Sequence, residues 1–307
     1  MEIKLNLNRI LSIFFLCLAP AVFSQDVKKN SVGDVVYEQY KNGDIDKALT
    51  KYRDMKAKKP AGYEFTEWEL NRIGYQLMLE DKDMAAAEKV FKLNIEEYPQ
   101  AANPHDSYAD YLMEKGDKQM AKKHYEQAVS MAEKSTRQDE KDLGKQSKAK
   151  LAKLDDKHKQ LDFLIGNWNV TSTDFSESTA GQVYSGSDEY VRIKDENMVM
   201  INHLNENGEV MGKRILVYDA VQDEYDVAYI DVKTPLGIET ATLKLKDLGN
   251  NSFELAEKYT AQDGKDKMMR HELKKRADGG MDWVIFESDA GKEDWKKVYA
   301  MDMKKKN

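Results

Sequence analysis

The sequence predicts a multidomain α + β protein, in which N-terminal α-helical hairpin repeats precede a C-terminal antiparallel up-and-down β-barrel of about ten strands. Three observations predict this fold class. The hydrophobic period changes from helical to alternating near residue 160. A layout of loop, alanine and aromatic residue recurs every 35 to 38 residues before that point, and turn residues recur every eight to twelve residues after it. The chain of 307 residues is long enough for two domains, which we place at 30–160 and 161–305.

Residues 1–24 have the pattern of a signal peptide, and we exclude them from the fold. Basic residues come first, an apolar stretch follows at 10–18, and small residues precede a cleavage position near Ser24-Gln25. The apolar stretch is too short to cross a bilayer as a helix. We therefore expect an exported protein, periplasmic or extracellular, with no integral membrane span in the mature chain.

Cys17 is the only cysteine of the chain and lies within this segment. Cleavage would leave a mature chain without cysteine, which excludes disulfides, thiolate nucleophiles and cysteine metal sites. Leu16 and Phe14 stand where a bacterial lipobox has small and aliphatic residues, so we do not expect lipidation.

Three segments of the N-terminal half share the repeated layout. A small residue allows two antiparallel helices to approach where they cross, and an aromatic residue about one turn later fills the space between neighbouring helix pairs. The loops, alanines and aromatics are Asn42-Gly-Asp44 with Ala48 and Tyr52, Glu80-Asp-Lys-Asp83 with Ala86 and Phe91, and Lys115-Gly-Asp117 with Ala121 and Tyr125.

Residues 30–135 resemble the tetratricopeptide repeat family. The motifs are Leu70-Asn-Arg-Ile-Gly74-Tyr75 with Ala86, Phe91 and Pro99, and then Tyr108-Ala109 with Leu112, Ala121, Tyr125 and Ala128. The resemblance implies a concave surface that docks a protein or peptide without chemistry of its own. We expect exposed polar side chains to line it, namely Asn71, Tyr75, Asn103, His105 and Asp106. The alternative is a structural spacer. Residues 136–160 are almost wholly polar and predict a capping helix.

The C-terminal half alternates with period two between turn signals. Asn207-Gly208, Asp263-Gly264 and Asp278-Gly-Gly280 predict hairpin turns because these residues tolerate positive φ. Closure of the meander into a barrel removes exposed sheet edges. The strands that we expect lie at 168–175, 182–193, 197–204, 210–219, 224–231, 238–246, 252–259, 267–276, 281–288 and 295–303.

The opening of this half, Gly166-Asn-Trp168, resembles the Gly-x-Trp start of lipocalin-like, or calycin, barrels. In that family the glycine permits a tight entry, and the tryptophan closes one end of the barrel beneath a cation from the last strand. The resemblance implies that Gly166 and Trp168 form the barrel floor, with Lys297 or Lys296 as the cation. The bacterial lipocalin-like domains that this half resembles have no assigned function.

Such barrels enclose one small hydrophobic or amphipathic ligand. On the expected strands, Arg214 shares a face with Tyr218, and Lys297 shares a face with Tyr299, so these four residues are our candidate ligand site. A buried cation needs an anionic ligand or an internal acid such as Glu257 or Glu272. The alternative is that these charges lie on the outer face of the barrel.

Motifs for catalysis and metal binding are missing from the sequence: a Gly-x-Ser-x-Gly elbow, a His-Glu-x-x-His pair, a phosphate-binding glycine loop and an EF-hand loop. We therefore expect no metal site. The only cofactor considered is haem, through His271, by resemblance to nitrobindin-type barrels. A surface histidine between Arg270 and Glu272 is the commoner arrangement. Residues 161–307 hold 28 acidic and 20 basic residues, a net charge near −8 that disfavours nucleic acid as a partner.

The sequence thus favours an exported, non-enzymatic binding protein, with repeats that dock a protein or peptide and a barrel that holds a small hydrophobic or amphipathic ligand. The first alternative is a structural envelope or assembly scaffold whose barrel is filled. The second is a hydrolase or a haem-binding protein with its site in the barrel.

Overall fold

The computed structural model describes residues 30–176, 179–193, 197–233, 237–261 and 264–306. The expected signal peptide, Cys17 and the expected cleavage position lie outside the described residues. The chain divides into two compact units, one ending at Glu69 and the other starting at Leu70.

In the first unit, α1 (Val32–Lys41) and α2 (Ile45–Lys58) form a helical hairpin. The short strands β1 (Asn30–Ser31) and β2 (Tyr63–Glu64) pair in parallel. At the start of α1 the Ser31 hydroxyl accepts a hydrogen bond from the backbone N–H of residue 34 at 3.0 Å, which satisfies one free donor of the first turn.

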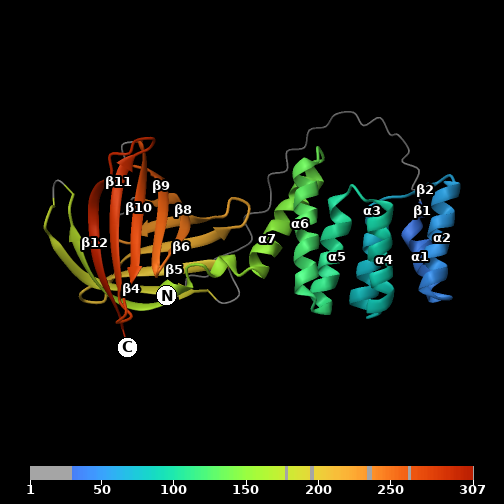
Figure 1. Ribbon diagram of the computed structural model, residues 1–307, viewed down its shortest axis with the longest axis horizontal. Coiled ribbons are helices and arrows are strands. Elements are labelled where there is room, and N and C mark those ends of the chain that lie inside the picture. Colours follow the sequence, from blue (N-terminus) through green and yellow to red (C-terminus); the bar gives the residue numbers. More distant parts are fainter. Residues whose placement is uncertain (1–29, 177–178, 194–196, 234–236, 262–263, 307) are drawn as a thin grey trace, which may run out of the picture. The chain divides into compact units, whose positions relative to one another are not determined.

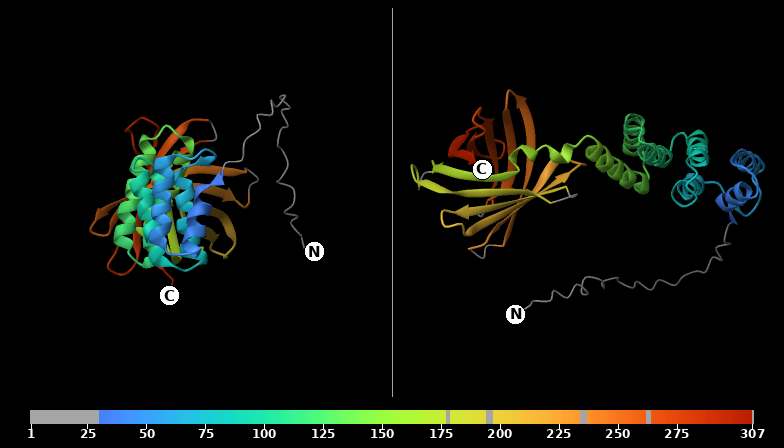
Figure 2. Two further views of the ribbon diagram at one scale, coloured as in Figure 1. Left: turned by 90° about the vertical axis from the view of Figure 1, so that its right-hand side faces the viewer. Right: turned by 90° about the horizontal axis from the view of Figure 1, so that it is seen from below.

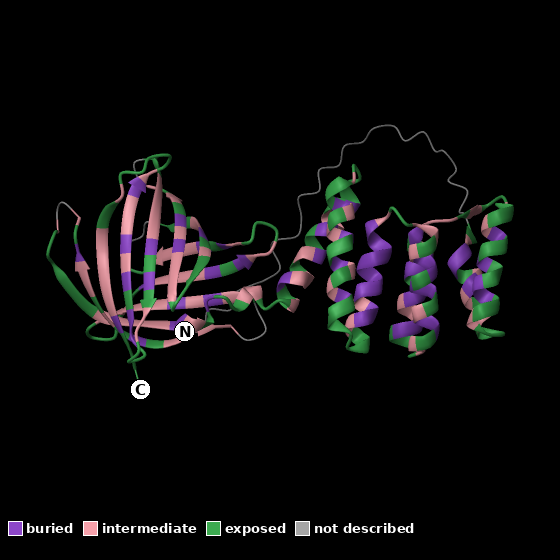
Figure 3. Cartoon of the chain, viewed as in Figure 1, coloured by how far each residue is buried: buried purple, intermediate pink, exposed green. Residues whose placement is uncertain are grey.

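The helices of the second unit continue as hairpins, and all but the last are seen roughly end-on in the right panel of Figure 2. They are α3 (Glu67–Tyr75), which begins at the boundary of the units and runs into the π-helical turn η1 (Gln76–Glu80), then α4 (Met84–Glu97), α5 (Ala102–Lys115), α6 (Lys118–Lys134) and α7 (Gln138–Leu154). A helical N-terminal region is therefore confirmed, and α5 is buried along most of its length (Figure 3).

The repeated loops have a common local cause. Asp44, Asp83 and Asp117 each cap the second helix of a hairpin, accepting a hydrogen bond from the backbone N–H three residues on, at 2.9 to 3.1 Å. The small residues lie at close crossings as expected: a Cβ built on Gly74 would come within 2.5 Å of the Phe91 ring. The spacing of loop, small residue and aromatic thus reflects capping followed by close packing.

We expect Gly74→Ala to destabilise the helical region, although alanine favours helices by about 1 kcal/mol over glycine. The added methyl group would overlap three atoms of the fully buried Phe91 ring, and overpacking of this kind costs about 1–3 kcal/mol. Urea unfolding followed by far-UV circular dichroism would measure the loss. A double variant with Phe91→Leu should regain part of it, and a Gly74→Ala chain as stable as the parent would contradict the packing.

Ten antiparallel strands follow and close into a barrel, in which each strand pairs with the next and the last pairs with the first (Figure 1). Each strand agrees with its expected range to within about three residues at either end. The strands are β3 (Gly166–Asp174), β4 (Val183–Arg192), β5 (Met198–Asn205), β6 (Val210–Asp219), β7 (Glu224–Asp231), β8 (Ile238–Gly249), β9 (Ser252–Thr260), β10 (Asp266–Lys275), β11 (Met281–Asp289) and β12 (Lys296–Lys305).

The end of the barrel where β3 begins is packed with large apolar side chains. Trp168 is buried there and donates its indole N–H to the Leu164 carbonyl at 2.7 Å. The cation beside it is Lys305, whose Nζ lies 5.6 Å from the ring centre, so the assignment of Lys297 or Lys296 to this contact was wrong. Because β12 runs antiparallel to β3, its last residues, and not its first, lie opposite Trp168.

Candidate functional site

Four polar side chains meet inside the barrel, away from the packed end. Glu257 of β9 lies 3.0 Å from His271 Nε2 and 3.5 Å from an Arg214 guanidinium nitrogen of β6. On the other side of the imidazole, the Trp283 indole N–H points at His271 Nδ1 at 3.1 Å. We call these four residues, Arg214, Glu257, His271 and Trp283, the inner network.

The inner network determines the protonation of His271. An indole N–H only donates, so His271 Nδ1 is the acceptor and the proton is on Nε2, which donates to the Glu257 carboxylate. Burial is the main cause that lowers the pKa of His271, so the imidazole is neutral. Both ring nitrogens are therefore used within the protein, and an axial haem bond at His271 would require one of these hydrogen bonds to break.

Glu257 is the anion of the inner network. Burial acts to raise its pKa and is the largest single effect, but Arg214 and the hydrogen bond from His271 together outweigh it, so the pKa is lowered. Glu257 is therefore the internal acid that accompanies Arg214. His271 is buried in the interior, and the surface position between Arg270 and Glu272 was the wrong interpretation.

Arg214 is the accessible member of the inner network. Its side chain is 30% exposed, against 5% for Glu257 and 2% for His271. Its guanidinium carbon lies 5.7 Å from the centre of the Tyr229 ring, a cation–π contact on the neighbouring strand. The same face of the barrel carries the half-buried Tyr259 and Tyr299. The guanidinium therefore remains partly open to solvent on an inner face that also carries tyrosine rings.

A second polar pair lies on the same inner face. Asp188 of β4 and His203 of β5 are directly opposite each other, with Asp188 Oδ1 and His203 Nδ1 2.8 Å apart. Their neighbours Tyr190 and Ile201 belong to the buried core, and two-residue alternation places all four side chains on the inner face. This pair was not anticipated from the sequence, although alternation around Ile201 points His203 inward.

Of the four ligand candidates predicted from the sequence, Arg214, Tyr218 and Tyr299 lie on the inner face of the barrel, and Lys297 does not. Tyr218 lies toward the packed end, where its hydroxyl donates to Asp223 at 2.6 Å and its ring meets Tyr225 edge-on. It therefore shares the inner face with Arg214 but lies nearer the packed end of the barrel.

Lys297 and Tyr299 do not share a face. The register shifts between Ile285 and Phe286 of β11, so Tyr299 pairs with Ile285 and Lys297 pairs with Phe286. Phe286 contacts the outward-facing Arg270, so its partner Lys297 lies on the outer face, where its Nζ is 4.0 Å from the centre of the Phe175 ring. A β-bulge at residue 298 thus interrupts the alternation that was expected along this strand.

The polar residues expected on the concave helical surface are mostly buried, so the expectation of exposure was wrong. Asn71 donates to Asn103 at 3.3 Å between α3 and α5. Asp106 accepts from Ser147 at 2.7 Å and from Lys150 at 2.8 Å, both on α7. These bonds join α5 to its neighbours and satisfy part of the polar groups that this mostly buried helix carries.

The two remaining candidates, Tyr75 and His105, also make hydrogen bonds to neighbouring helices. The half-buried Tyr75 donates to Asp110 at 2.6 Å. His105 Nδ1 lies 3.1 Å from His124 Nδ1, and the two rings stack. One imidazole of this pair must donate and the other accept, so the pair is stable only while at least one ring is neutral.

Acid should destabilise the α5–α6 hairpin through this histidine pair. Burial, followed by the nearby His124, lowers the pKa of His105 to about 4 from an ordinary value of 6.5. The folded state therefore binds fewer protons, so the pair's contribution is full above pH 6.5 and is lost as the pH falls toward 4. Hydrogen exchange of α5 and α6 amides should report this loss. His105→Phe should flatten the pH dependence, and an unchanged profile would contradict this assignment.

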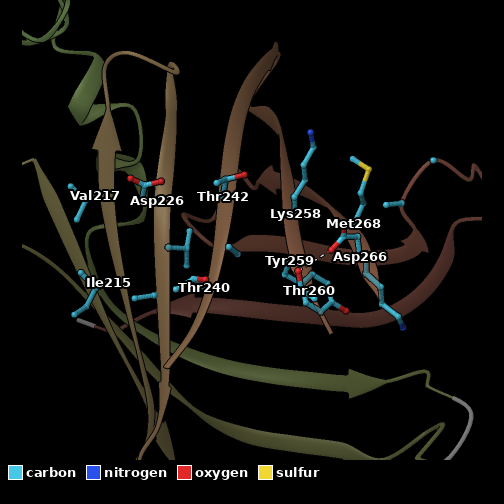
Figure 4. A pocket seen from close by; sticks show the side chains of 16 residues that line it. Ile215, Val217, Asp226, Thr240, Thr242, Lys258, Tyr259, Thr260, Asp266 and Met268 are labelled. Carbon is cyan, nitrogen blue, oxygen red and sulfur yellow. Dashed lines mark hydrogen bonds between the residues drawn. The ribbon is translucent and has the colours of Figure 1, made fainter. Parts of the chain in front are cut away.

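A cavity of about 790 Å³ lies against the outer face of β6 to β10 (Figure 4). Small side chains form its floor, Ala228 on β7 and Thr240 and Thr242 on β8, between larger ones such as Ile215 and Met268. Strand pairing places these residues in adjacent cross-strand rows. This cavity on the outer face was not predicted. The run of small residues at outward positions is the feature of the sequence that indicates it.

Within the described ranges, no group of three or more histidine, cysteine, aspartate and glutamate side chains is placed to hold a metal ion. No helix of the described part of the chain is long and apolar enough to cross a membrane.

No protein-family model matches the chain, and no curated protein matches it. Among solved structures, Rv2717c from M. tuberculosis is similar over 49% of this chain and 98% of its own, with a TM-score of 0.35 and 11% identity. A redesigned beta barrel covers 48% of this chain and 94% of its own, with a TM-score of 0.25 and 10% identity. The redesigned beta barrel mFAP1, bound to DFHBI, is similar over 47% of this chain and 96% of its own, with a TM-score of 0.23 and 12% identity.

Proposed function

We propose that the barrel binds a small amphipathic molecule that carries a carboxylate, with Arg214 as the group that holds the acid. The observation that supports this most is an inward cation with a 30% exposed side chain, whose counter-ion Glu257 lies at the long distance of 3.5 Å. A guanidinium can pair with two carboxylates at different edges because it has five N–H donors. The inner Glu257 and an incoming carboxylate would then share one cation.

The interior of the barrel suits the remainder of such a ligand. Partly buried apolar side chains pack around the interior, including Val170, Ala241, Met269 and Met301. Aromatic rings on neighbouring strands are large apolar surfaces with polar edges, which match an amphipathic chain. Thioethers adapt to ligands of different shape. Specificity for the acid group and tolerance for the chain are the expected properties.

The test is equilibrium binding of a fluorescent fatty acid to the purified mature chain and to Arg214→Met. Loss of a charge-assisted hydrogen bond of about 1.5–3 kcal/mol predicts at least tenfold weaker binding by the variant. Lys213→Met is the matched control, because its side chain lies on the opposite face of the same strand, and it should bind like the parent. Equal binding by Arg214→Met, or no binding by the parent, would contradict the proposal.

We also propose that the repeats, which resemble tetratricopeptide repeats, dock a peptide segment of a protein partner. The support is a hollow of about 520 Å³ along α3 and the π-helical turn η1, lined by Arg72, Tyr75, Gln76, Leu79 and Glu80, in which Leu79 is largely exposed. Local π-helical turns are common at functional positions. A partner identified by crosslinking at residue 79 should bind Leu79→Asp at least tenfold more weakly, and Met120→Asp on α6 should leave its affinity unchanged.

Export is a third part of the proposed function, and its support is the pattern of residues 1–24. Terminal sequencing of the native protein should begin at or near Gln25, in the periplasmic or extracellular fraction. A native protein that retains Met1 would contradict it.

A further inference from the structure

We propose that the Asp188–His203 pair forms a hydrogen bond with a second polar group of the ligand, a hydroxyl close to its carboxylate. The barrel would then bind hydroxylated fatty acids more tightly than unsubstituted fatty acids. This inference rests on the proposed function. His203 is 32% exposed on the inner face although its strand is paired on both sides. One edge of the imidazole is therefore open to the interior.

The tautomer of His203 follows from its partner. A carboxylate only accepts, so the bond at 2.8 Å places a proton on His203 Nδ1 and leaves Nε2 available to a ligand. Asp188 holds the ring in this orientation and in turn lies 3.4 Å from the Tyr190 hydroxyl, which donates to it. His203 Nε2 can accept from a ligand hydroxyl when the ring is neutral and donate to it when the ring is protonated, so a hydroxyl suits this nitrogen in either state.

The position of His203 places its imidazole near the proposed acid site. His203 pairs with Gly212, two residues from Arg214 on the same inner face of β6. Gly212 has no side chain to fill the space, and the Tyr229 hydroxyl occupies it: a Cβ there would come within 2.7 Å of that oxygen. Glycine at this position therefore admits the Tyr229 ring, which lies beside both the guanidinium and the imidazole.

Two measured distances bound the separation of the contacts. The Tyr229 ring centre lies 5.7 Å from the Arg214 guanidinium carbon and 6.4 Å from the His203 ring centre, so these two groups are at most about 12 Å apart. A hydrogen bond at each end takes up about 3 Å. The remaining span is at most about 6 Å, which a hydroxyl within a few carbon atoms of the carboxylate can bridge, as in a β-hydroxy fatty acid.

The test compares palmitate with each enantiomer of β-hydroxypalmitate by competition against the fluorescent fatty acid. The parent chain should bind one enantiomer about five- to tenfold more tightly than palmitate, as one added hydrogen bond predicts. His203→Phe should lose this preference and keep its affinity for palmitate within about twofold. Asp188→Asn, in which the ring is no longer held by a carboxylate, should reduce the preference.

The outcomes separate the two proposals. If the parent binds palmitate and both hydroxy acids equally, or if His203→Phe keeps the preference, the inference about His203 is overturned while the Arg214 proposal stands. If the parent binds none of the three acids, both are overturned. Should His203→Phe not fold, imidazole nitrogen resonances of the parent decide: the Nε2 signal of His203 should shift with the preferred enantiomer and not with palmitate, and an equal response to both would overturn the inference.

Discussion

Glu257→Leu is expected to lower the free energy of unfolding of the barrel by about 3–5 kcal/mol, because the substitution leaves Arg214 and the His271 Nε2–H without their common partner. Glu257→Gln should cost less, since its amide oxygen still accepts from His271 but no longer carries the charge beside Arg214. Urea unfolding followed by near-UV circular dichroism would measure both. Glu254→Gln on the same strand is the matched control and should stay within about 0.5 kcal/mol of the parent.

The pH dependence gives an independent check on the same residue. The pKa of Glu257 is lowered below 4.5, so its contribution to stability is present above that pH and is lost as the pH falls through the folded-state value. The difference in stability between the parent and Glu257→Gln should therefore shrink on acidification below pH 4.5. A constant difference across this range would show that folding does not lower the pKa of Glu257.

Trp168→Ala is the second large effect that we expect, a loss of about 3–5 kcal/mol for removal of a buried tryptophan. The substitution opens a cavity at the packed end, removes the N–H that the Leu164 carbonyl accepts, and takes the ring from beneath Lys305. Trp68→Ala is the matched control, because Trp68 is half exposed and its loss should cost far less. Equal losses in the two variants would contradict a structural role for Trp168 in the barrel.

The strands could be predicted from the sequence because their signals are local. Alternation and turn residues such as Gly208 and Gly279, both with positive φ, are read within a few neighbouring residues. The same alternation pointed Arg214 inward and named Glu257 as one of two acids that could accompany it. The bulge on the last strand was not predictable, since an extra residue at 298 leaves no mark in the composition of Lys297-Val-Tyr299.

The candidate sites were less predictable because burial depends on distant segments. The charged neighbours of His271 predicted a surface position, whereas alternation with Leu273 places its side chain inside the barrel. Asn103 and Asp106 were read as exposed because polar residues usually are, but α5 is enclosed by other helices and uses them as internal hydrogen-bond partners. Pairings such as Asp188 with His203 depend on strand register, which a single sequence does not determine.

The most direct test of the central claim is carbon-13 NMR of carboxyl-labelled palmitate mixed with the mature chain and titrated with acid. A carboxylate held by the Arg214 guanidinium should give a separate bound resonance that stays ionised to a lower pH than the carboxyl of a free monomeric acid. In Arg214→Met the bound resonance should be lost or should titrate at higher pH than in the parent. A bound resonance that titrates identically in the parent and in Arg214→Met would contradict the claim that this arginine holds the ligand.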